Sequence, residues 1–366
     1  MNSGRTKMFL NIEIPGKTIK YSFQKFCNMK KTVLYFILFL AFLGPIFVYG
    51  QQPEIRKIWD KAPHNAFTDL IRYKSHFYCT FREGESHVPH DTTENGTIRI
   101  IRSKNGNEWN SMAFLTSDKY DLRDPKLSIT PDNKLMVLMG GSHYRKGENL
   151  EKLSHVAFSG NGSDFTQSRP VAIEESVRTQ HDWIWRTTWR KNTGYAVVYQ
   201  TRLPDDTWQT RLLKTKDGIS YQHVCELDVG SKPNEATIRF DGEQMFVLVR
   251  RANGANGMLG KSQPPYQDWT WHELEFRLGG PNFIFLPDDK LCIGSRHYKD
   301  SGAQTALFVT DRQGNLKQTI DLPSGGDTSY PGMLIFNNKL WVSYYSSHEE
   351  KTAIYLAKVR MNNLVE

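Results

Sequence analysis

The hydrophobic pattern of the chain repeats six times. In each repeat a short apolar run, which predicts a β-strand, is followed by a tight turn and a second apolar run that opens on a Lys-Leu-like pair. The pairs stand 46 to 60 residues apart, a spacing typical of propeller blades. We therefore predict an all-β, six-bladed β-propeller. The pairs are His76-Phe77, Lys134-Leu135, Gly194-Tyr195, Gln244-Met245, Lys290-Leu291 and Lys339-Leu340.

Equivalent positions of the repeats carry related chemistry. Six residues after the start of three pairs there is an arginine, and nine residues before the start of two pairs there is a glutamate or a tyrosine. Such positions near strand ends face the axis of a propeller, so these groups are expected to share one pocket. Cations, a carboxylate and a phenol suit an anionic, polyhydroxylated ligand. The later positions are Arg82, Gly140, Gln200, Arg250, Arg296 and Tyr345; the earlier ones are Phe67, Pro125, Trp185, Glu235, Pro281 and Tyr330.

The repeats occupy most of the 366 residues, from about residue 64 to residue 359. They leave no room for a second domain, so residues 51–366 are predicted to form one propeller. Residues 1–50 are predicted to be an extended N-terminus with a signal peptide. Aromatic residues make up 12% and charged residues 23% of the chain, which is typical of a globular, sheet-rich protein.

The net charge of +8 comes mainly from the N-terminal segment. Residues 1–50 hold seven Lys or Arg and one acid, which leaves 40 basic and 38 acidic side chains in the remainder. A nearly balanced propeller attracts polyanions weakly. Neither nucleic acid nor an anionic membrane surface is therefore expected as a partner.

Residues 29–50 have the pattern of a secretory signal peptide. Met29-Lys30-Lys31 is basic, residues 33–50 are uncharged and apolar, and cleavage is expected near Gly50. The alternative is an uncleaved anchor, because the run is close to the roughly 17 residues that can span a bilayer. We expect a secreted, periplasmic or extracellular protein without a stable membrane span. Residues 1–28 are not expected to fold, and Met29 is an alternative initiator.

The sequence indicates no metal site, cofactor site or disulfide framework. His87 and His90 are three residues apart in a predicted loop, and no phosphate loop or dinucleotide fingerprint occurs. Cys79, Cys225 and Cys292 follow the signal segment at unrelated spacings. Cys79 and Cys292 lie among apolar residues and are expected to be buried free thiols.

Three predicted turns have one sequence form. Ser103–Trp109, Ser159–Phe165 and Thr215–Tyr221 each place Asn or Asp before Gly, a hairpin signal because both residues can take positive φ. They resemble the Asp-boxes of the sialidase superfamily in a form one residue shorter. The resemblance covers residues 57–360 and implies a six-bladed propeller. We expect the turns to be structural, since Asp-boxes also occur in proteins without sialidase chemistry, so activity must be argued from the site.

The resemblance also implies roles for four residues. Sialidases use a tyrosine nucleophile assisted by a glutamate, an aspartate as acid/base, and three arginines that bind the substrate carboxylate. Tyr330 and Glu235 match the nucleophile and its glutamate, while Arg250 and Arg296 match the second and third arginines. A neutral phenol suits an anionic substrate because a carboxylate nucleophile would repel it, and a contacting glutamate can accept the phenolic proton.

The match fails at the first arginine. Sialidases carry it in an Arg-Ile-Pro stretch that opens the first blade, whereas this chain has residues 64–70, beginning His64-Asn65, at that place. Arg82 on the neighbouring strand is the candidate to compensate. This difference argues against sialic acid as the substrate more than it argues against glycan chemistry in general.

Several loop residues complete the predicted site. The acid/base is open among Asp91, which lies about where the family's aspartate loop is, and Glu83 and His87, which leave a strand in a polar loop. Trp185 is either a sugar-stacking ring or a core ring. The side chains expected to shape the substrate pocket are His64, Asn65, Arg123, Asp124, Trp185, Arg186, Asp327 and His348.

The favoured function is that of a secreted, sialidase-like, exo-acting glycoside hydrolase. Its substrate would end in an acidic sugar such as a sialic or uronic acid. One alternative is a polysaccharide lyase, in which Tyr330 or His64 removes a proton beside a uronate carboxylate. The other is a glycan-binding propeller without catalysis. The reaction products separate these three possibilities, because a lyase leaves an unsaturated, ultraviolet-absorbing sugar.

Overall fold

The computed structural model describes residues 8–14, 17–23, 52–201, 203, 205 and 207–365. The chain divides into two compact units, residues 1–51 and 52–366. In the first unit β1 (Met8–Ile14) and β2 (Lys17–Phe23) form an antiparallel pair, although the sequence predicts no folded element there. Both runs contain β-branched and aromatic residues, which favour strands. The predicted signal segment, residues 29–50, lies outside the described residues.

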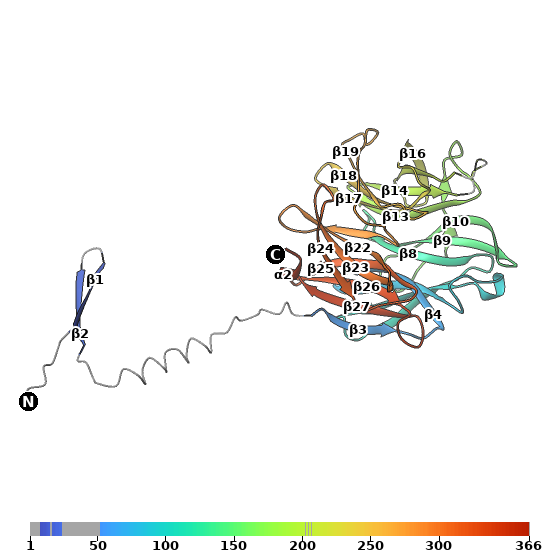
Figure 1. The fold of residues 1–366 in the computed structure, drawn as a ribbon. Coiled ribbons are helices and arrows are strands. Elements are labelled where there is room, and N and C mark those ends of the chain that lie inside the picture. The colour runs from blue at the N-terminus through green and yellow to red at the C-terminus, as the bar shows by residue number, and fades with distance from the viewer. Residues whose placement is uncertain are drawn as a thin grey trace, which may run out of the picture. The chain divides into compact units, whose positions relative to one another are not determined.

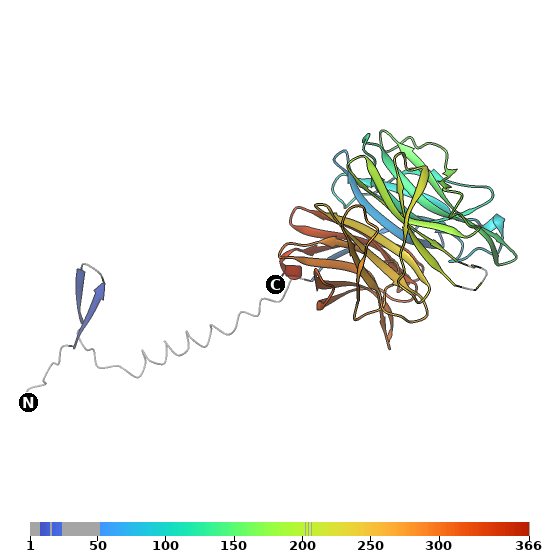
Figure 2. The same ribbon diagram turned by 90° about the horizontal axis from the view of Figure 1, so that it is seen from above.

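The second unit is a six-bladed β-propeller, which confirms the predicted fold class (Figures 1 and 2). Within the described residues, no helix is long and apolar enough to cross a membrane. Blade 1 comprises β4 (His64–Tyr73), β5 (His76–Gly84), β6 (Thr97–Ser103) and β7 (Asn110–Leu115), with a short 3₁₀ helix η1 (Thr92–Glu94). Blade 2 comprises β8 (Asp121–Ile129), β9 (Leu135–Arg145), β10 (Glu148–Ser159) and β11 (Arg169–Pro170).

Blade 3 gains a fifth strand, because β12 (Ala172–Ile173) pairs in parallel with β16 (Ser220–Glu226). The remaining strands of blade 3 are β13 (Asp182–Arg190), β14 (Thr193–Gln200), β15 (Gln209–Thr215) and β16 (Ser220–Glu226). Blade 4 comprises β17 (Pro233–Asp241), β18 (Gln244–Arg251), β19 (Met258–Ser262) and β20 (Thr270–Glu273). Blade 5 comprises β21 (Asn282–Phe285), β22 (Lys290–Lys299), β23 (Gly302–Asp311) and β24 (Leu316–Leu322).

Blade 6 closes the ring with a strand from before the first repeat. Its first three strands are followed by β3 (Glu54–Trp59) at the outer edge, and β3 pairs antiparallel with β27 (Ala353–Arg360) (Figure 1). The backbone hydrogen bonds of this pair tie the two ends of the propeller together, which removes two free sheet edges. Blade 6 comprises β25 (Thr328–Phe336), β26 (Lys339–Ser346), β27 (Ala353–Arg360) and β3 (Glu54–Trp59), and a short helix α2 (Asn362–Val365) follows it.

The six pairs that marked the repeats open the second strand of each blade to within one residue. Each pair of neighbouring blades shares a buried apolar cluster. The cluster between blades 6 and 1 includes Phe77 and Trp341, whose rings stack with centroids 4.3 Å apart. Because neighbouring blades cover the inner part of each sheet on both faces, the inner strands are rich in apolar residues on both sides.

The three Asp-box-like turns share one hydrogen-bond pattern. In each turn the first residue's hydroxyl accepts from the glycine N–H, at 2.8 Å for Ser103 and Ser159 and 2.9 Å for Thr215. Only the glycine takes positive φ, so the prediction that the preceding Asn or Asp also does so is wrong. Those side chains instead accept hydrogen bonds from the turn backbone, an Asx-type arrangement.

Each turn glycine packs against the preceding blade. A Cβ on Gly106, Gly162 or Gly218 would meet Trp341, Tyr78 or Met136, and each of these residues directly follows a repeat pair. Each turn therefore needs its glycine for two reasons: the positive φ and the close contact between blades.

We predict that Gly162→Ala destabilises the propeller by about 1–3 kcal/mol, because its φ is +81° and the new Cβ would lie 2.1 Å from the Tyr78 hydroxyl. Gly160→Ala in the same turn is the matched control, since a Cβ there meets nothing within 4 Å. Urea unfolding of both variants measures the difference. Equal stability of the two variants would show that the glycine does not hold the blades together.

Candidate active site

The first strand of five blades is irregular at the position that the repeats predicted to face the axis. The pairing register shifts across Phe67 in β4, Pro125 in β8, Trp185 in β13, Glu235 in β17 and Tyr330 in β25. A bulge re-aims side chains and increases local twist. Phe67 and Tyr330 also take positive φ, of 65° and 53°.

Glu235 and Tyr330 meet across the axis of the propeller. The Tyr330 hydroxyl donates to Glu235 Oε1 at 2.6 Å, and Arg250 donates to the same oxygen at 2.7 Å. The N–H of Gly280 donates to Oε2 at 2.7 Å. Gly280 has φ +63° and a Cβ there would lie 2.4 Å from the Tyr330 ring, so only glycine allows this approach. The repeat pattern contained no sign of Gly280.

The electrostatics of this pair favour an ionised glutamate beside a neutral phenol. Burial by itself would raise the pKa of Glu235, but Arg250, Tyr330 and the Gly280 N–H outweigh it and hold that pKa below its ordinary value. Burial and the negative Glu235 raise the pKa of Tyr330 well above its ordinary value, against the effect of Arg250. The phenol therefore keeps its proton until a reaction consumes it, and Glu235 is placed to accept that proton.

Two of the three arginines at equivalent repeat positions flank Glu235 and Tyr330. The side chains of Arg250 and Arg296 are 24% and 19% exposed, so both remain partly open to solvent. Arg296 donates twice to the carbonyl of Thr328, at 2.9 and 2.8 Å. This contact fixes the fork of Arg296 next to the strand that carries Tyr330.

The third arginine, Arg82, does not reach the site, contrary to the sequence prediction. Its side chain is fully buried and donates to Asp121 at 2.8 and 2.7 Å and to the carbonyl of Ser86 at 2.7 Å. All three guanidinium nitrogens are therefore engaged inside the protein. A carboxylate from the next blade takes the place that a ligand would need.

The first strand of blade 2 contributes an arginine, Arg123, and a buried acid, Asp124. Arg123 lies over the Phe67 ring, 4.8 Å from its centroid, and donates to the carbonyl of His87 at 3.1 Å. Asp124 is 8% exposed, and its Oδ1 has no hydrogen-bond partner in the described part of the chain. Burial raises the pKa of Asp124 and Glu235 adds to this, while Arg123 and Lys126 oppose it. Asp124 is thus a carboxyl group that holds its proton more firmly than usual.

Lys126 belongs to the site and was missed by the sequence analysis. Its ammonium lies 4.5 Å from the ring centroid of Trp185 and 5.8 Å from that of Tyr330. Burial lowers its pKa to about 8, against the attraction of Asp124. The available signal was a third charged residue after Arg123 and Asp124 in the first strand of blade 2. Trp185 is 1% exposed and packs behind Tyr330, so it forms the wall of the site and does not present a stacking face.

Asp327 gathers a second group of polar side chains next to Arg296. Its Oδ2 lies 3.1 Å from His64 Nε2 and 2.6 Å from His87 Nδ1, and its Oδ1 accepts from the Tyr345 hydroxyl at 2.7 Å. The His87 ring also packs edge-on against Phe67, with centroids 5.1 Å apart. Of the three predicted acid/base candidates, His87 is the one placed among these residues.

The remaining predicted residues have structural contacts elsewhere. Asp91 caps η1 by accepting from Thr93, and Glu83 is bound by Arg99 and by the Trp59 indole. The other three form the following contacts: the Asn65 amide donates to the carbonyls of Ala62 and Thr352, Arg186 pairs with buried Asp69 across blades 1 and 3, and exposed His348 bonds Ser346.

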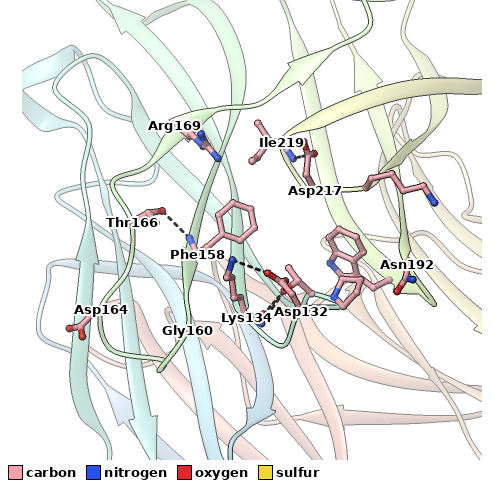
Figure 3. Close-up of a pocket in the computed structure, with 14 residues that line it drawn as sticks. Asp132, Lys134, Phe158, Gly160, Asp164, Thr166, Arg169, Asn192, Asp217 and Ile219 are labelled. Atoms are coloured by element: carbon pink, nitrogen blue, oxygen red, sulfur yellow. Dashed lines mark hydrogen bonds and ion pairs between the residues drawn. The ribbon is translucent and has the colours of Figure 1, made fainter.

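A groove of about 660 Å³ lies elsewhere, between the turns of blades 2 and 3 (Figure 3). Its charged residues serve the turns, since Lys134 pairs with Asp132 at 2.8 Å and Asp217 accepts from the N–H of Ile219. None of the predicted site residues lines it. The axial cluster of Glu235, Tyr330 and the two arginines is therefore the better candidate for chemistry.

Comparison with solved structures agrees with the propeller. No protein-family model and no curated protein matches the sequence. A protein of unknown function from Dyadobacter fermentans superposes with a TM-score of 0.68 at 18% identity, over 84% of this chain and 99% of its own. A Hadza microbial sialidase gives a TM-score of 0.68 at 13% identity, over 83% of this chain and 67% of its own.

A further similar structure is Trypanosoma rangeli sialidase in complex with the inhibitor DANA. It gives a TM-score of 0.62 at 13% identity, over 81% of this chain and 55% of its own, so this chain spans about half of that protein's length. Structural similarity at such low identity defines the fold. The chain has the six-bladed propeller fold of the sialidases, in a divergent sequence.

Proposed function

We propose that the protein is a glycoside hydrolase that removes a terminal acidic sugar, with Tyr330 as nucleophile and Glu235 as its proton acceptor. The observation that carries the proposal is the 2.6 Å hydrogen bond between these two groups, flanked by Arg250 and Arg296. A guanidinium fork binds a carboxylate through two parallel hydrogen bonds, so an acidic sugar suits the two arginines.

The reaction follows from the protonation states. The Tyr330 oxygen attacks the anomeric carbon while its proton passes to Glu235, and the bond to the leaving oxygen breaks as that oxygen gains a proton. Water then attacks the anomeric carbon and gives its proton to the conjugate base of the group that protonated the leaving oxygen. The bond to the Tyr330 oxygen breaks, Tyr330 recovers its proton from Glu235, and the free sugar leaves. Two displacements at one carbon imply retention of the anomeric configuration.

Asp124 is the group best suited to protonate the leaving oxygen. It is buried, its pKa is raised, and one of its oxygens has no partner in the described part of the chain. A general acid works best with a pKa near the working pH, and burial shifts the pKa of Asp124 upward, in that direction. Asp124 thus replaces Asp91, Glu83 and His87, the candidates that the sequence left open.

The proposed substrate is a glycan or glycoconjugate outside the cytoplasm. The leader pattern at residues 29–50 supports export, and glycans with terminal acidic sugars occur on cell surfaces and in the surrounding matrix. The similar sialidases make a sialic acid a reasonable first substrate to test, and uronic acids share the carboxylate that the arginines would bind.

We predict that Tyr330→Phe lowers kcat by about 1,000-fold or more, because removal of the hydroxyl removes the nucleophile. Wild type and variant are compared on fluorogenic glycosides of sialic acid, uronic acids and neutral sugars. Tyr195→Phe, which removes a phenol in blade 3 packed against Phe240 and Tyr266, is the folding control and should keep wild-type activity. Undiminished turnover by Tyr330→Phe would exclude the mechanism, and an unsaturated product would indicate a lyase.

We predict that Asp124→Asn slows cleavage of substrates in proportion to the basicity of their leaving group. An alkyl glycoside needs protonation and should react about 100-fold or more slowly, whereas an activated nitrophenyl glycoside needs little and should react nearly as fast as with wild type. Steady-state rates on the two substrates measure the ratio. An equal loss on both would assign Asp124 a role in binding or folding instead.

A further inference from the structure

Two imidazoles and a carboxylate converge next to the proposed active site. Nε2 of His64 and Nδ1 of His87 both point at Oδ2 of Asp327, at 3.1 and 2.6 Å. The three atoms all lie within 4.8 Å of one another. His64 opens β4, His87 lies in the loop after β5, and Asp327 directly precedes β25. The group exists only because the ring closes, so no spacing along the sequence could indicate it.

We infer that His64, His87 and Asp327 form a binding site for a divalent transition-metal ion of the Zn²⁺ class. Two imidazole nitrogens and one carboxylate oxygen are ligands that Zn²⁺ accepts, and three protein ligands leave a further position open to water or to a substrate oxygen. Ca²⁺ and Mg²⁺ prefer sets composed of oxygen ligands, so this mixed set selects against them. The site is separate from the Tyr330–Glu235 pair and does not depend on glycosidase activity.

The distances allow an ion to enter with small movements. Ligand bonds of about 2.0–2.2 Å around a tetrahedral ion place the ligand atoms roughly 3.3–3.6 Å apart. The His64–Asp327 separation of 3.1 Å is close to this range, and the His87–Asp327 separation of 2.6 Å must open by less than about 1 Å. The His87 side chain is 47% exposed, so it can make that adjustment, while His64 is held at 10% exposure.

Neighbouring groups hold the ligand side chains in position. The fold encloses two of the three ligands, since the side chains of His64 and Asp327 are 10% and 28% exposed. Tyr345 fixes the other carboxylate oxygen at 2.7 Å, as outer-shell donors do in metal sites.

Arg296 limits the affinity of the site. Its guanidinium lies 3.7 Å from Asp327 Oδ1, and this charge repels a cation. We therefore expect weaker binding than in a closed four-ligand zinc site. The same closeness places the open position of the ion beside a residue that the proposed function assigns to a sugar carboxylate.

Isothermal titration of the full chain with zinc chloride, after removal of metals with a chelator, tests the inference. Wild type should bind one Zn²⁺ per chain, and His87→Ala should weaken binding about tenfold or more. His87 is the ligand to replace, because its exposed ring contributes least to the core. His90→Ala is the matched control, since this exposed histidine lies in the same loop and should leave the affinity unchanged.

Titration with Co²⁺ gives a second readout, because cobalt bound by imidazole and carboxylate absorbs visible light. The absorption should appear in wild type and in Tyr330→Phe and be absent in His87→Ala, which separates this inference from the proposed function. Absence of stoichiometric Zn²⁺ binding in wild type would overturn the inference. Equal affinity in His87→Ala and wild type would overturn it as well, by placing the ion elsewhere.

Discussion

The buried carboxylate of Glu235 is the constraint on which the site depends. A charge at 6% exposure needs partners, and it finds them in Arg250 of its own blade, the Gly280 N–H before blade 5 and the Tyr330 hydroxyl of blade 6. Loss of one partner from a buried charged pair typically costs about 3–5 kcal/mol. The chemistry and the closure of the propeller are therefore coupled, because Tyr330 reaches Glu235 only when blade 6 is in place.

That closure depends on a strand that the repeats do not include. β3 completes blade 6 from the N-terminal side, and the cluster between blades 6 and 1 contains Phe67, Tyr345 and, at its edge, Tyr330. The packing that holds the last blade to the first thus also orients the proposed nucleophile. The buried Asp69–Arg186 pair joins blades 1 and 3, and Asp69 accepts from the N–H of Leu127 in blade 2.

The sequence predicted what is periodic and missed what is particular to one blade. Lys-Leu-like pairs mark the second strand of each blade because that strand is buried in every blade. Counting along the chain from these pairs also located Glu235, Arg250, Arg296 and Tyr330. It misplaced Arg82, because a carboxylate from the next blade, Asp121, binds that arginine where no repeat position could indicate it. Strand alternation near a bulge explains why Trp185 backs Tyr330 while the adjacent Arg186 joins Asp69.

The balance of charge around Tyr330 explains how the site can attract an anionic ligand and also contain Asp124 as a candidate general acid. Arg123, Arg250, Arg296 and protonated Lys126 outnumber the ionised Glu235 and Asp327, so the cluster attracts a negative ligand. A sugar carboxylate bound there adds negative charge near Asp124, which disfavours its ionised form. Binding of an acidic substrate would therefore raise the pKa of Asp124 further and favour its protonated form. A neutral sugar supplies no such charge, so an acidic sugar would strengthen both its own binding and the protonation of the group proposed to release its leaving oxygen.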